Sequence, residues 1–352
     1  MRVAYALRHC LTLPLVAICI LVIGTRSPAS HAQTNPPTVR SESTVVLVPT
    51  LVRTKSGDVV HGLTAKDFVV EDNGIEQAVR LDDSPDAESL SIVVAVETGG
   101  AAGLLLPNPG ATKDPSKEVP LSGLGNMIEA FVGRDKAEVA VVAFDSQVRL
   151  VQNFTDDIPI AADKLDRLGP GDGGAAILDA VSYSAKLLNL RPTNGRRVLI
   201  LISEMRDQGS HIAKIANVVQ EIGLSNTLVY SVAFSPARAQ FMHDLHEKPR
   251  RGVYPNLLAP LMIGVNGVRK NTAKNIAALA GGEYAMFTNA RNFDDQMETF
   301  AGDDRDRYML TFQPTDPTPG RHTIAVRLRN PRGGYVVTAR SMYWSVARAA
   351  QH

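Results

Sequence analysis

Two glutamates, Glu97 and Glu204, stand at the ends of apolar runs that read as β-strands. The runs are Ser91–Val96 and Arg197–Ile202, and such near-continuous apolar stretches are typical of strands buried on both faces. Two carboxylates could form the acid/base pair of a hydrolase. That chemistry needs a sugar-sized cleft lined with aromatic side chains, and aromatic residues make up only 5% of the chain. We therefore expect no enzymatic activity and keep a carboxylate-pair hydrolase as an alternative.

Other candidate patterns do not have the spacing that their chemistry requires. One cluster reads His243-Asp244-Leu245-His246-Glu247, which differs from the zinc-protease patterns His-Glu-x-x-His and His-x-x-Glu-His. No third ligand is evident, and we interpret the cluster as surface residues of a short helix. The chain contains no Gly-x-x-x-x-Gly-Lys, no Gly-x-Gly-x-x-Gly opening a helix and no Gly-x-Ser-x-Gly. Phosphate-binding loops and the serine-hydrolase elbow are therefore not indicated.

Composition and charge also limit the classes of function. The chain has 352 residues and is 44% apolar, enough for one domain of ordinary size plus a smaller one. The whole chain has 37 Lys and Arg residues and 36 Asp and Glu residues. Residues 1–32 contain three of the arginines and no acidic residue, so the rest of the chain has 34 basic and 36 acidic residues and a net charge of −2. Nucleic acids and anionic membranes attract an excess of Lys and Arg, so we expect no nucleic-acid partner.

Residues 1–32 have the features of a signal peptide. Arg2 and Arg8 precede the apolar stretch Leu11–Gly24, and small residues at the −3 and −1 positions predict cleavage after Ala32. The alternative is an uncleaved membrane anchor, but the stretch is shorter than the ~20 residues that span a bilayer. Both cysteines lie in this leader, so the mature chain would have no disulfide. We expect a secreted or periplasmic protein without an integral membrane segment after cleavage.

The apolar pattern divides the remaining chain. Residues 33–43 form a flexible lead-in, 44–86 an N-terminal β segment, 87–304 an α/β domain, and 305–346 a C-terminal β segment that pairs with the first. In the β segments, a hairpin is predicted over Phe68–Leu81 because Asn73-Gly74 suits a type I′ turn. Further strands are predicted at Thr44–Thr54, Tyr308–Gln313, His322–Arg329 and Tyr335–Tyr343.

Strand-like and helical patterns alternate within 87–304, which predicts an α/β fold with a doubly wound, mostly parallel sheet. The predicted strands are Ser91–Val96, Glu138–Phe144, Arg197–Ile202, Thr227–Phe234 and Glu283–Phe287, with a short antiparallel edge strand at Gln147–Val151. The predicted helices are Leu121–Val132, Ala176–Leu190, His211–Ile222 and Asn271–Ala280.

Several stretches give the chain a resemblance to the bacterial von Willebrand factor A-related proteins. They are Leu63–Gly74, Arg307-Tyr308-Met309-Leu310, the Pro319-Gly320 turn, and three loops that follow predicted strands. The resemblance covers nearly the whole mature chain. It implies a von Willebrand factor A-type sheet between N- and C-terminal strands. It also implies a site at the carboxyl ends of the parallel strands, where open α/β sheets place ligands.

In that family the three loops hold a divalent metal through Asp-x-Ser-x-Ser, a Thr and an Asp. The corresponding residues here are Glu97, Gly99, Ala101, Ala175 and Glu204. Three of the five carry no side-chain oxygen, whereas Mg²⁺ requires six oxygens in octahedral array. We therefore expect a degenerate site without a metal cofactor. Weak Mg²⁺ or Ca²⁺ binding, with Thr98, Ser203, Asp172 and Asp207 rebuilding a site, is the alternative.

The same mapping brings the two glutamates together at adjacent strand ends. Two close carboxylates repel, so one should hold a proton more readily, and Arg206 or a partner's lysine could neutralise them. We expect this face to bind another protein through Glu97, Thr98, Gly99, Ala101, Ala175, Glu204 and Asp207. Residues 235–270 form an insertion that could overhang the face as a lid, with Arg250 and Arg251 as candidate contacts.

Overall fold

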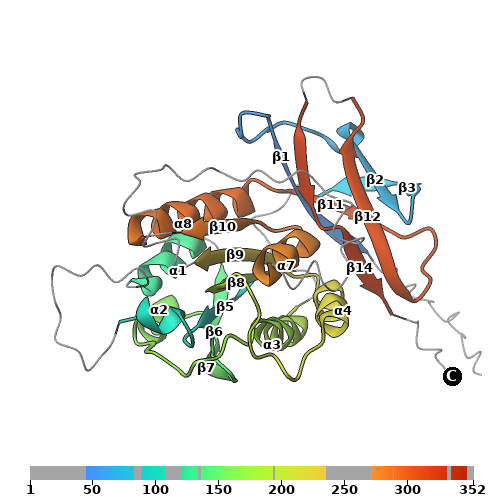
Figure 1. Cartoon of the computed structure of the whole chain (residues 1–352). Helices are drawn as coiled ribbons and strands as arrows, with labels where there is room; N and C mark the ends of the chain where they lie inside the picture. The colour runs from blue at the N-terminus through green and yellow to red at the C-terminus, as the bar shows by residue number, and fades with distance from the viewer. Residues whose placement is uncertain are drawn as a thin grey trace, which may run out of the picture. The chain divides into compact units, whose positions relative to one another are not determined.

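The computed structural model describes residues 45–82, 89–107, 121, 123–133, 136–192, 195–234, 271–287, 289–330 and 334–346. The predicted signal peptide, the predicted lead-in and the predicted insertion 235–270 lie outside these residues. Within them, the predicted class is confirmed: a mostly parallel sheet flanked by helices, with further antiparallel sheets built from N- and C-terminal strands (Figure 1).

The central sheet has six strands in the order β10-β9-β8-β5-β6-β7. All neighbours are parallel except β6 and β7, which are antiparallel. The bounds are β5 Leu90–Glu97, β6 Ala137–Phe144, β7 Val148–Thr155, β8 Arg196–Glu204, β9 Leu228–Phe234 and β10 Tyr284–Phe287. Every residue of β5 and β9 is buried, which explains why these strands read as continuous apolar runs. The predicted antiparallel edge strand is confirmed as β7, although it is longer than expected.

Helices cover both faces of this sheet. One hydrophobic cluster joins the sheet to α1 (Leu124–Val132), α2 (Ile158–Asp166) and α8 (Ala290–Arg305). A second cluster joins the opposite face to α3 (Ile177–Asn189), α4 (Ile215–Ser225) and α7 (Thr272–Ala280). Figure 1 shows these two groups of helices on either side of the strands. The arrangement buries both faces, as a parallel sheet requires.

The N- and C-terminal strands form two four-stranded antiparallel sheets. Their orders are β13-β1-β11-β4 and β14-β12-β2-β3, and one hydrophobic cluster draws residues from both. The bounds are β1 Val46–Arg53, β2 Phe68–Asp72, β3 Ile75–Gln77, β4 Val79–Leu81, β11 Tyr308–Phe312, β12 Gly320–Leu328, β13 Val336–Ala339 and β14 Met342–Ser345. The short helix η1 (Ala65–Asp67) precedes β2 and has the capping box expected of a capped turn.

Two segments that were each predicted as one continuous strand are each two shorter strands in the structure. The stretch Tyr335–Tyr343 is divided between β13 and β14, which belong to different sheets, and the second half of the hairpin is divided between β3 and β4 in the same way. The chain crosses from one sheet to the other at each division. Arg340 lies at one crossing, where its buried guanidinium donates to the carbonyl of Met342. The Asn73-Gly74 turn itself is confirmed, since both residues have the positive φ of a type I′ turn.

Buried ion pairs connect the terminal strands to the central sheet. Arg53 of β1 pairs with Glu283, which precedes β10, at 3.1 Å and also with Asp303 of α8. Arg307 lies between α8 and β11, and its Nε donates to the hydroxyl of Tyr230 in β9 at 3.0 Å. Removing one member of such a buried set leaves an uncompensated charge. The set therefore favours one arrangement of these elements.

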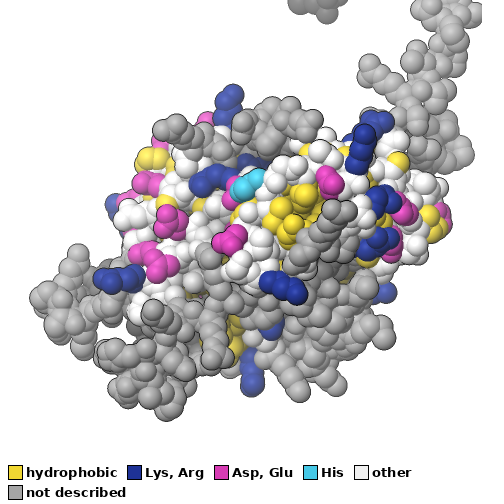
Figure 2. All heavy atoms as spheres, turned by 90° about the horizontal axis from the view of Figure 1, so that it is seen from above, with side chains coloured by type: hydrophobic (Ala, Val, Ile, Leu, Met, Phe, Trp, Pro, Cys, Tyr) yellow, Lys and Arg dark blue, Asp and Glu magenta, His cyan; other side chains and the backbone are white. Residues whose placement is uncertain are grey.

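Surface charge is mixed on the face seen in Figure 2. Described Lys and Arg side chains lie among Asp and Glu side chains there, and neither sign covers that face. None of the helices in the described part of the chain has the length and apolar character to span a bilayer.

Candidate functional site

Glu97 and Glu204 lie together at the carboxyl ends of β5 and β8, which are neighbours in the sheet. The backbone N–H of Glu204 donates to Oε2 of Glu97 at 2.8 Å. In the other direction, Oε1 of Glu204 accepts a hydrogen bond from the backbone N–H of Ala101 at 3.0 Å. The two carboxylates thus bind the backbone of each other's loops. They connect the first loop (residues 97–101) to the third (residues 203–208).

Burial dominates the electrostatics of Glu97. Its side chain is 0% exposed, and Oε1 has no hydrogen-bond partner among the described residues. Burial raises the pKa of Glu97 to about 8, and the nearby charge of Glu204 contributes a smaller increase. The sequence predicted a raised proton affinity from repulsion, whereas the larger cause is loss of solvent. Burial therefore favours the protonated form of this carboxyl group.

The second loop, residues 171–175, closes directly onto the first. The N–H of Gly100 donates to the carbonyl of Asp172 at 2.9 Å, and the N–H of Gly171 donates to the carbonyl of Thr98 at 2.7 Å. A Cβ atom on Gly99 would lie 2.1 Å from the carbonyl oxygen of Gly174. The volume that a side chain at position 99 would need is therefore filled by backbone.

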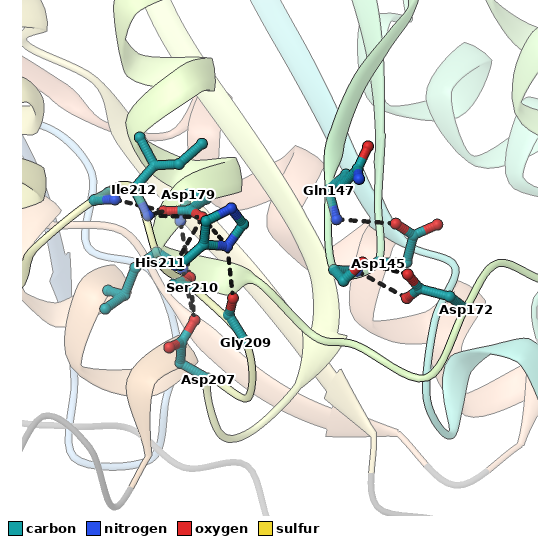
Figure 3. Close-up of polar contacts among 12 residues, drawn as sticks. Asp145, Gln147, Asp172, Asp179, Asp207, Gly209, Ser210, His211 and Ile212 are labelled. Atoms are coloured by element: carbon teal, nitrogen blue, oxygen red, sulfur yellow. Dashed lines mark hydrogen bonds and ion pairs between the residues drawn. The ribbon is translucent and has the colours of Figure 1, made fainter.

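The second and third loops are also joined. Ala175 and Gln208 exchange two backbone hydrogen bonds, of 2.8 and 2.9 Å. Asp207, expected at the recognition face, accepts from the N–H of Leu178 at 3.0 Å and from the hydroxyl of Ser210 at 2.5 Å. Its carboxylate thus stabilises the start of α3 and its own loop. Figure 3 shows this cluster beside a second one that contains Asp145 and Asp172.

The second cluster contains residues that the sequence analysis did not select. Asp145 follows β6, is buried, and pairs with Arg149 of β7 at 2.6 Å. The same guanidinium donates to the hydroxyl of Thr98 at 3.3 Å. The rule that pointed to Glu97, a carboxylate directly after a parallel strand, would also have found Asp145. Arg149 supplies a positive charge beside Thr98.

Asp172 attaches the second loop to the turn between β6 and β7. Its carboxylate accepts from the hydroxyl and the N–H of Ser146 and from the N–H of Gly174. These hydrogen bonds, the one from the Ser146 hydroxyl first, lower the pKa of Asp172. The ionised carboxylate of Asp172 thus stabilises the loop through these hydrogen bonds.

The side chains of the three loops decide whether this site could hold the divalent ion that this kind of fold implies. Ala101 and Ala175 offer no side-chain oxygen, and position 99 has no room for one. Glu97 is buried, and one of its carboxyl oxygens is engaged with the backbone N–H of Glu204. Among the residues that the structure describes, no group of three His, Cys, Asp or Glu side chains is arranged to hold a metal. The donor set does not fit Mg²⁺ or Ca²⁺.

The candidate residues therefore divide by exposure. Glu97, Thr98 and Ala175 are buried, whereas Ala101, Glu204 and Asp207 are partly exposed. The buried ones do not reach the surface and would support a recognition face from beneath. Arg250 and Arg251, together with the rest of the insertion, lie outside the described residues. The buried position of Glu97 gives no support to a carboxylate-pair hydrolase.

The Arg149–Asp145 pair gives a direct test of this network. We expect Arg149→Gln to lower the free energy of unfolding by about 1–2 kcal/mol, because the buried carboxylate of Asp145 loses its ion pair. Urea unfolding followed by circular dichroism would measure it. Arg167→Gln is the matched control: Arg167 also pairs with an acid four residues away, Asp163, at 2.7 Å, but is 75% exposed against 48% for Arg149. Its expected change is within about 0.5 kcal/mol; equal effects of the two substitutions would contradict the proposed role of Arg149.

Comparison with known protein families gives one match. Residues 116–221 match the family model of the von Willebrand factor type A domain. This segment includes the second and third loops described above and ends within α4. The first loop, with Glu97, lies before it. None of the curated proteins matches the chain at a significant level.

Several solved structures are similar to the chain at low sequence identity. The conserved hypothetical protein BatB from Bacteroides thetaiotaomicron is 13% identical, with 61% of this chain and 98% of that chain covered and a TM-score of 0.39. The PilB minor pilin from Streptococcus sanguinis is 12% identical, with 64% of each chain covered and a TM-score of 0.41. A von Willebrand factor type A protein from Catenulispora acidiphila is 11% identical, with 87% of this chain and 75% of that chain covered and a TM-score of 0.41.

Proposed function

We propose that this chain, because it contains a von Willebrand factor type A domain, is an exported protein-binding module that contacts its partner without a divalent ion. Export rests on the signal-peptide features of residues 1–32. Protein binding rests on the domain type and on the carboxyl-end face of the sheet, where open α/β sheets bind ligands. The partner is another protein.

The observation that supports metal independence most strongly is the set of direct contacts between the loops. Hydrogen bonds connect the first loop to the second through Gly100, the first to the third through Glu97, and the second to the third through Ala175. A bound cation would otherwise hold such loops together. Because the protein's own groups already do so, the face is organised before a partner arrives. Preorganisation of this kind lowers the entropic cost of binding.

Capture of the partner with and without a chelator tests the proposal. The exported protein is purified, and its N-terminal sequence is expected to begin at Gln33. It is then immobilised and exposed to an envelope extract of the source organism in Mg²⁺ or in EDTA. We expect the same protein to be captured in both. Glu204→Lys should abolish capture because it reverses charge at the partly exposed glutamate of the face.

The control is Glu129→Lys, the same charge reversal at an exposed glutamate of α1. It should capture as the wild type does. Loss of capture in EDTA would contradict metal independence. So would micromolar Mg²⁺ binding in calorimetry that Glu97→Ala and Glu204→Ala abolish, and that result would favour the metal-dependent adhesion alternative. Equal capture by the two charge-reversal variants would contradict the assignment of the face.

A further inference from the structure

Three polar side chains form a buried cluster in the sheet β14-β12-β2-β3 (Figure 1). His322 belongs to β12, Asp72 ends β2, and Tyr343 belongs to β14. Each of them is at most 4% exposed. Nδ1 of His322 lies 2.9 Å from Oδ1 of Asp72, and the hydroxyl of Tyr343 donates to Oδ2 of the same carboxyl group at 2.9 Å. The cluster thus connects three strands away from solvent.

The contacts of the His322 ring require a specific number of protons. Nε2 lies 2.7 Å from the carbonyl oxygen of Thr318, whereas the hydroxyl of that residue is farther away, at 3.4 Å. A carbonyl only accepts, so Nε2 carries a proton, and a neutral imidazole has no second one. Without a further proton, lone pairs of Nδ1 and of Oδ1 of Asp72 would face each other. The observed arrangement therefore needs one proton between these two atoms, on either side.

Asn73 decides which contact of the ring is lost when that proton leaves. Its Oδ1 accepts from the N–H of Thr323 at 2.9 Å, so the atom that lies 3.3 Å from Nδ1 of the ring is the amide nitrogen Nδ2. An amide nitrogen donates, and only a bare Nδ1 can accept from it. A neutral ring would therefore keep its single N–H on Nε2 and its bond to Thr318. The contact with Asp72 is the one that would open.

The other titratable and charged groups around the cluster do not replace this proton. Burial, followed by the hydrogen bond to Asp72, raises the pKa of Tyr343, so the tyrosine keeps its own proton and directs it to the carboxyl group. Arg340, at the crossing between β13 and β14, and Asp316, in the turn before β12, act on Tyr343 with opposite signs. Among the described residues, Asp72 is the acid that pairs with His322.

We propose that the Asp72–His322 pair is a pH-sensitive contact, which joins the end of β2 to β12 while the shared proton is bound and opens when the proton is released to solvent. Histidine is the side chain whose ordinary change of charge falls between pH 5 and 8. The contact is complete below the transition and lost above it. Opening would act on the turn at Asn73, because Asn73 and Thr323 exchange hydrogen bonds beside the pair, both of 2.9 Å.

NMR spectroscopy of the isotope-labelled full chain from pH 5 to 9 tests this proposal. The signals followed are the ring nitrogens of His322 and the backbone amides of Asn73 and Thr323. As the pH rises, we expect the Nδ1 signal to change while Nε2 keeps its bonded proton, and the two amides to shift in the same transition. Glu97 belongs to another sheet, so Glu97→Gln should leave this transition unchanged. A ring that does not change in this range, or amides that do not follow it, would overturn the proposal.

Asp72→Asn is the decisive variant, measured after circular dichroism shows that it folds. The new amide can donate to Nδ1 of a neutral ring and accept from Tyr343, so both contacts form without the extra proton, and the joint shift of the amides should disappear. Glu71→Gln is the matched control, because Glu71 is on the same strand and pairs with Arg327 of β12 at 3.2 Å but is 30% exposed. It should keep the wild-type transition. An unchanged transition in Asp72→Asn, or its loss in Glu71→Gln, would disprove the assignment to this pair; if Asp72→Asn does not fold, the wild-type spectra decide.

Discussion

Replacing Gly99 with serine, the residue that the metal-binding pattern has at this position, is expected to destabilise the protein by about 3 kcal/mol or more. The Cβ atom would lie 2.1 Å from the carbonyl oxygen of Gly174 and 2.7 Å from that of Asp172. Both are backbone atoms, so no side-chain rotation relieves the overlap. The second loop would have to move and break its hydrogen bonds to Gly100 and Thr98. Overpacking and lost backbone hydrogen bonds together give effects of this size.

Denaturant unfolding of Gly99→Ser and Gly173→Ala would check this expectation. Gly173 is in the same loop, but a Cβ atom there would meet nothing within 4 Å. We expect its substitution to change the free energy of unfolding by less than about 1 kcal/mol. If Gly99→Ser were as stable as the wild type, the loops would not be closed as described. If it also bound Mg²⁺, the site would be restorable and the donor-set argument would be wrong.

The second large effect is a dependence of stability on pH that originates at Glu97. In the unfolded chain this carboxyl group should titrate near 4.5, whereas in the folded protein burial raises its pKa to about 8. The folded state therefore holds a proton that the unfolded state releases between these two values. The contribution of Glu97 to the free energy of unfolding is fully present below about pH 4.5 and decreases as the pH rises to about 8. Above that pH the contribution is lost. The total loss is on the order of 4–5 kcal/mol, at 1.36 kcal/mol for each pKa unit.

Glu97→Gln should remove this decline. The amide is neutral at every pH, and its oxygen can accept from the N–H of Glu204 as Oε2 does. Urea unfolding from pH 5 to 9 should show a steeper loss for the wild type than for the variant. Glu129→Gln, an exposed control, should keep the wild-type slope. Parallel curves for the wild type and Glu97→Gln would mean that Glu97 is solvated in the folded protein.

The ionisation of Glu97 should also affect the loops of the proposed binding face. Above about pH 8 the folded protein would carry two neighbouring carboxylates at 97 and 204, one of them buried. The loops that they connect would then become easier to separate.

Much of the fold could be predicted from local pattern. Strands buried on both faces must be apolar throughout, so β5, β6, β8 and β9 are visible as runs, and Asn73-Gly74 predicts its turn because few other pairs tolerate positive φ. Helix α8 was missed, although Phe293, Met297 and Phe300 have helical spacing, because the remainder of that segment is polar. Helix α4 begins four residues later than predicted. The N–H groups of residues 211–213 bind Asp179 and not a preceding helical turn.

The sequence by itself determined which oxygen atoms this face lacks, because side-chain chemistry at positions 99, 101 and 175 is readable without coordinates. The resemblance to the von Willebrand factor A-related proteins also implied that Glu97 and Glu204 meet at adjacent strand ends. Only the tertiary structure decided how the loops are held. Three contacts illustrate this. Gly174 approaches Gly99, Arg149 pairs with Asp145, and Asp179 binds the loop that contains Ile212. The residues in these contacts are 4 to 75 positions apart in the sequence. Distances between separate loops depend on how the whole sheet and its helices pack, and no local pattern encodes them.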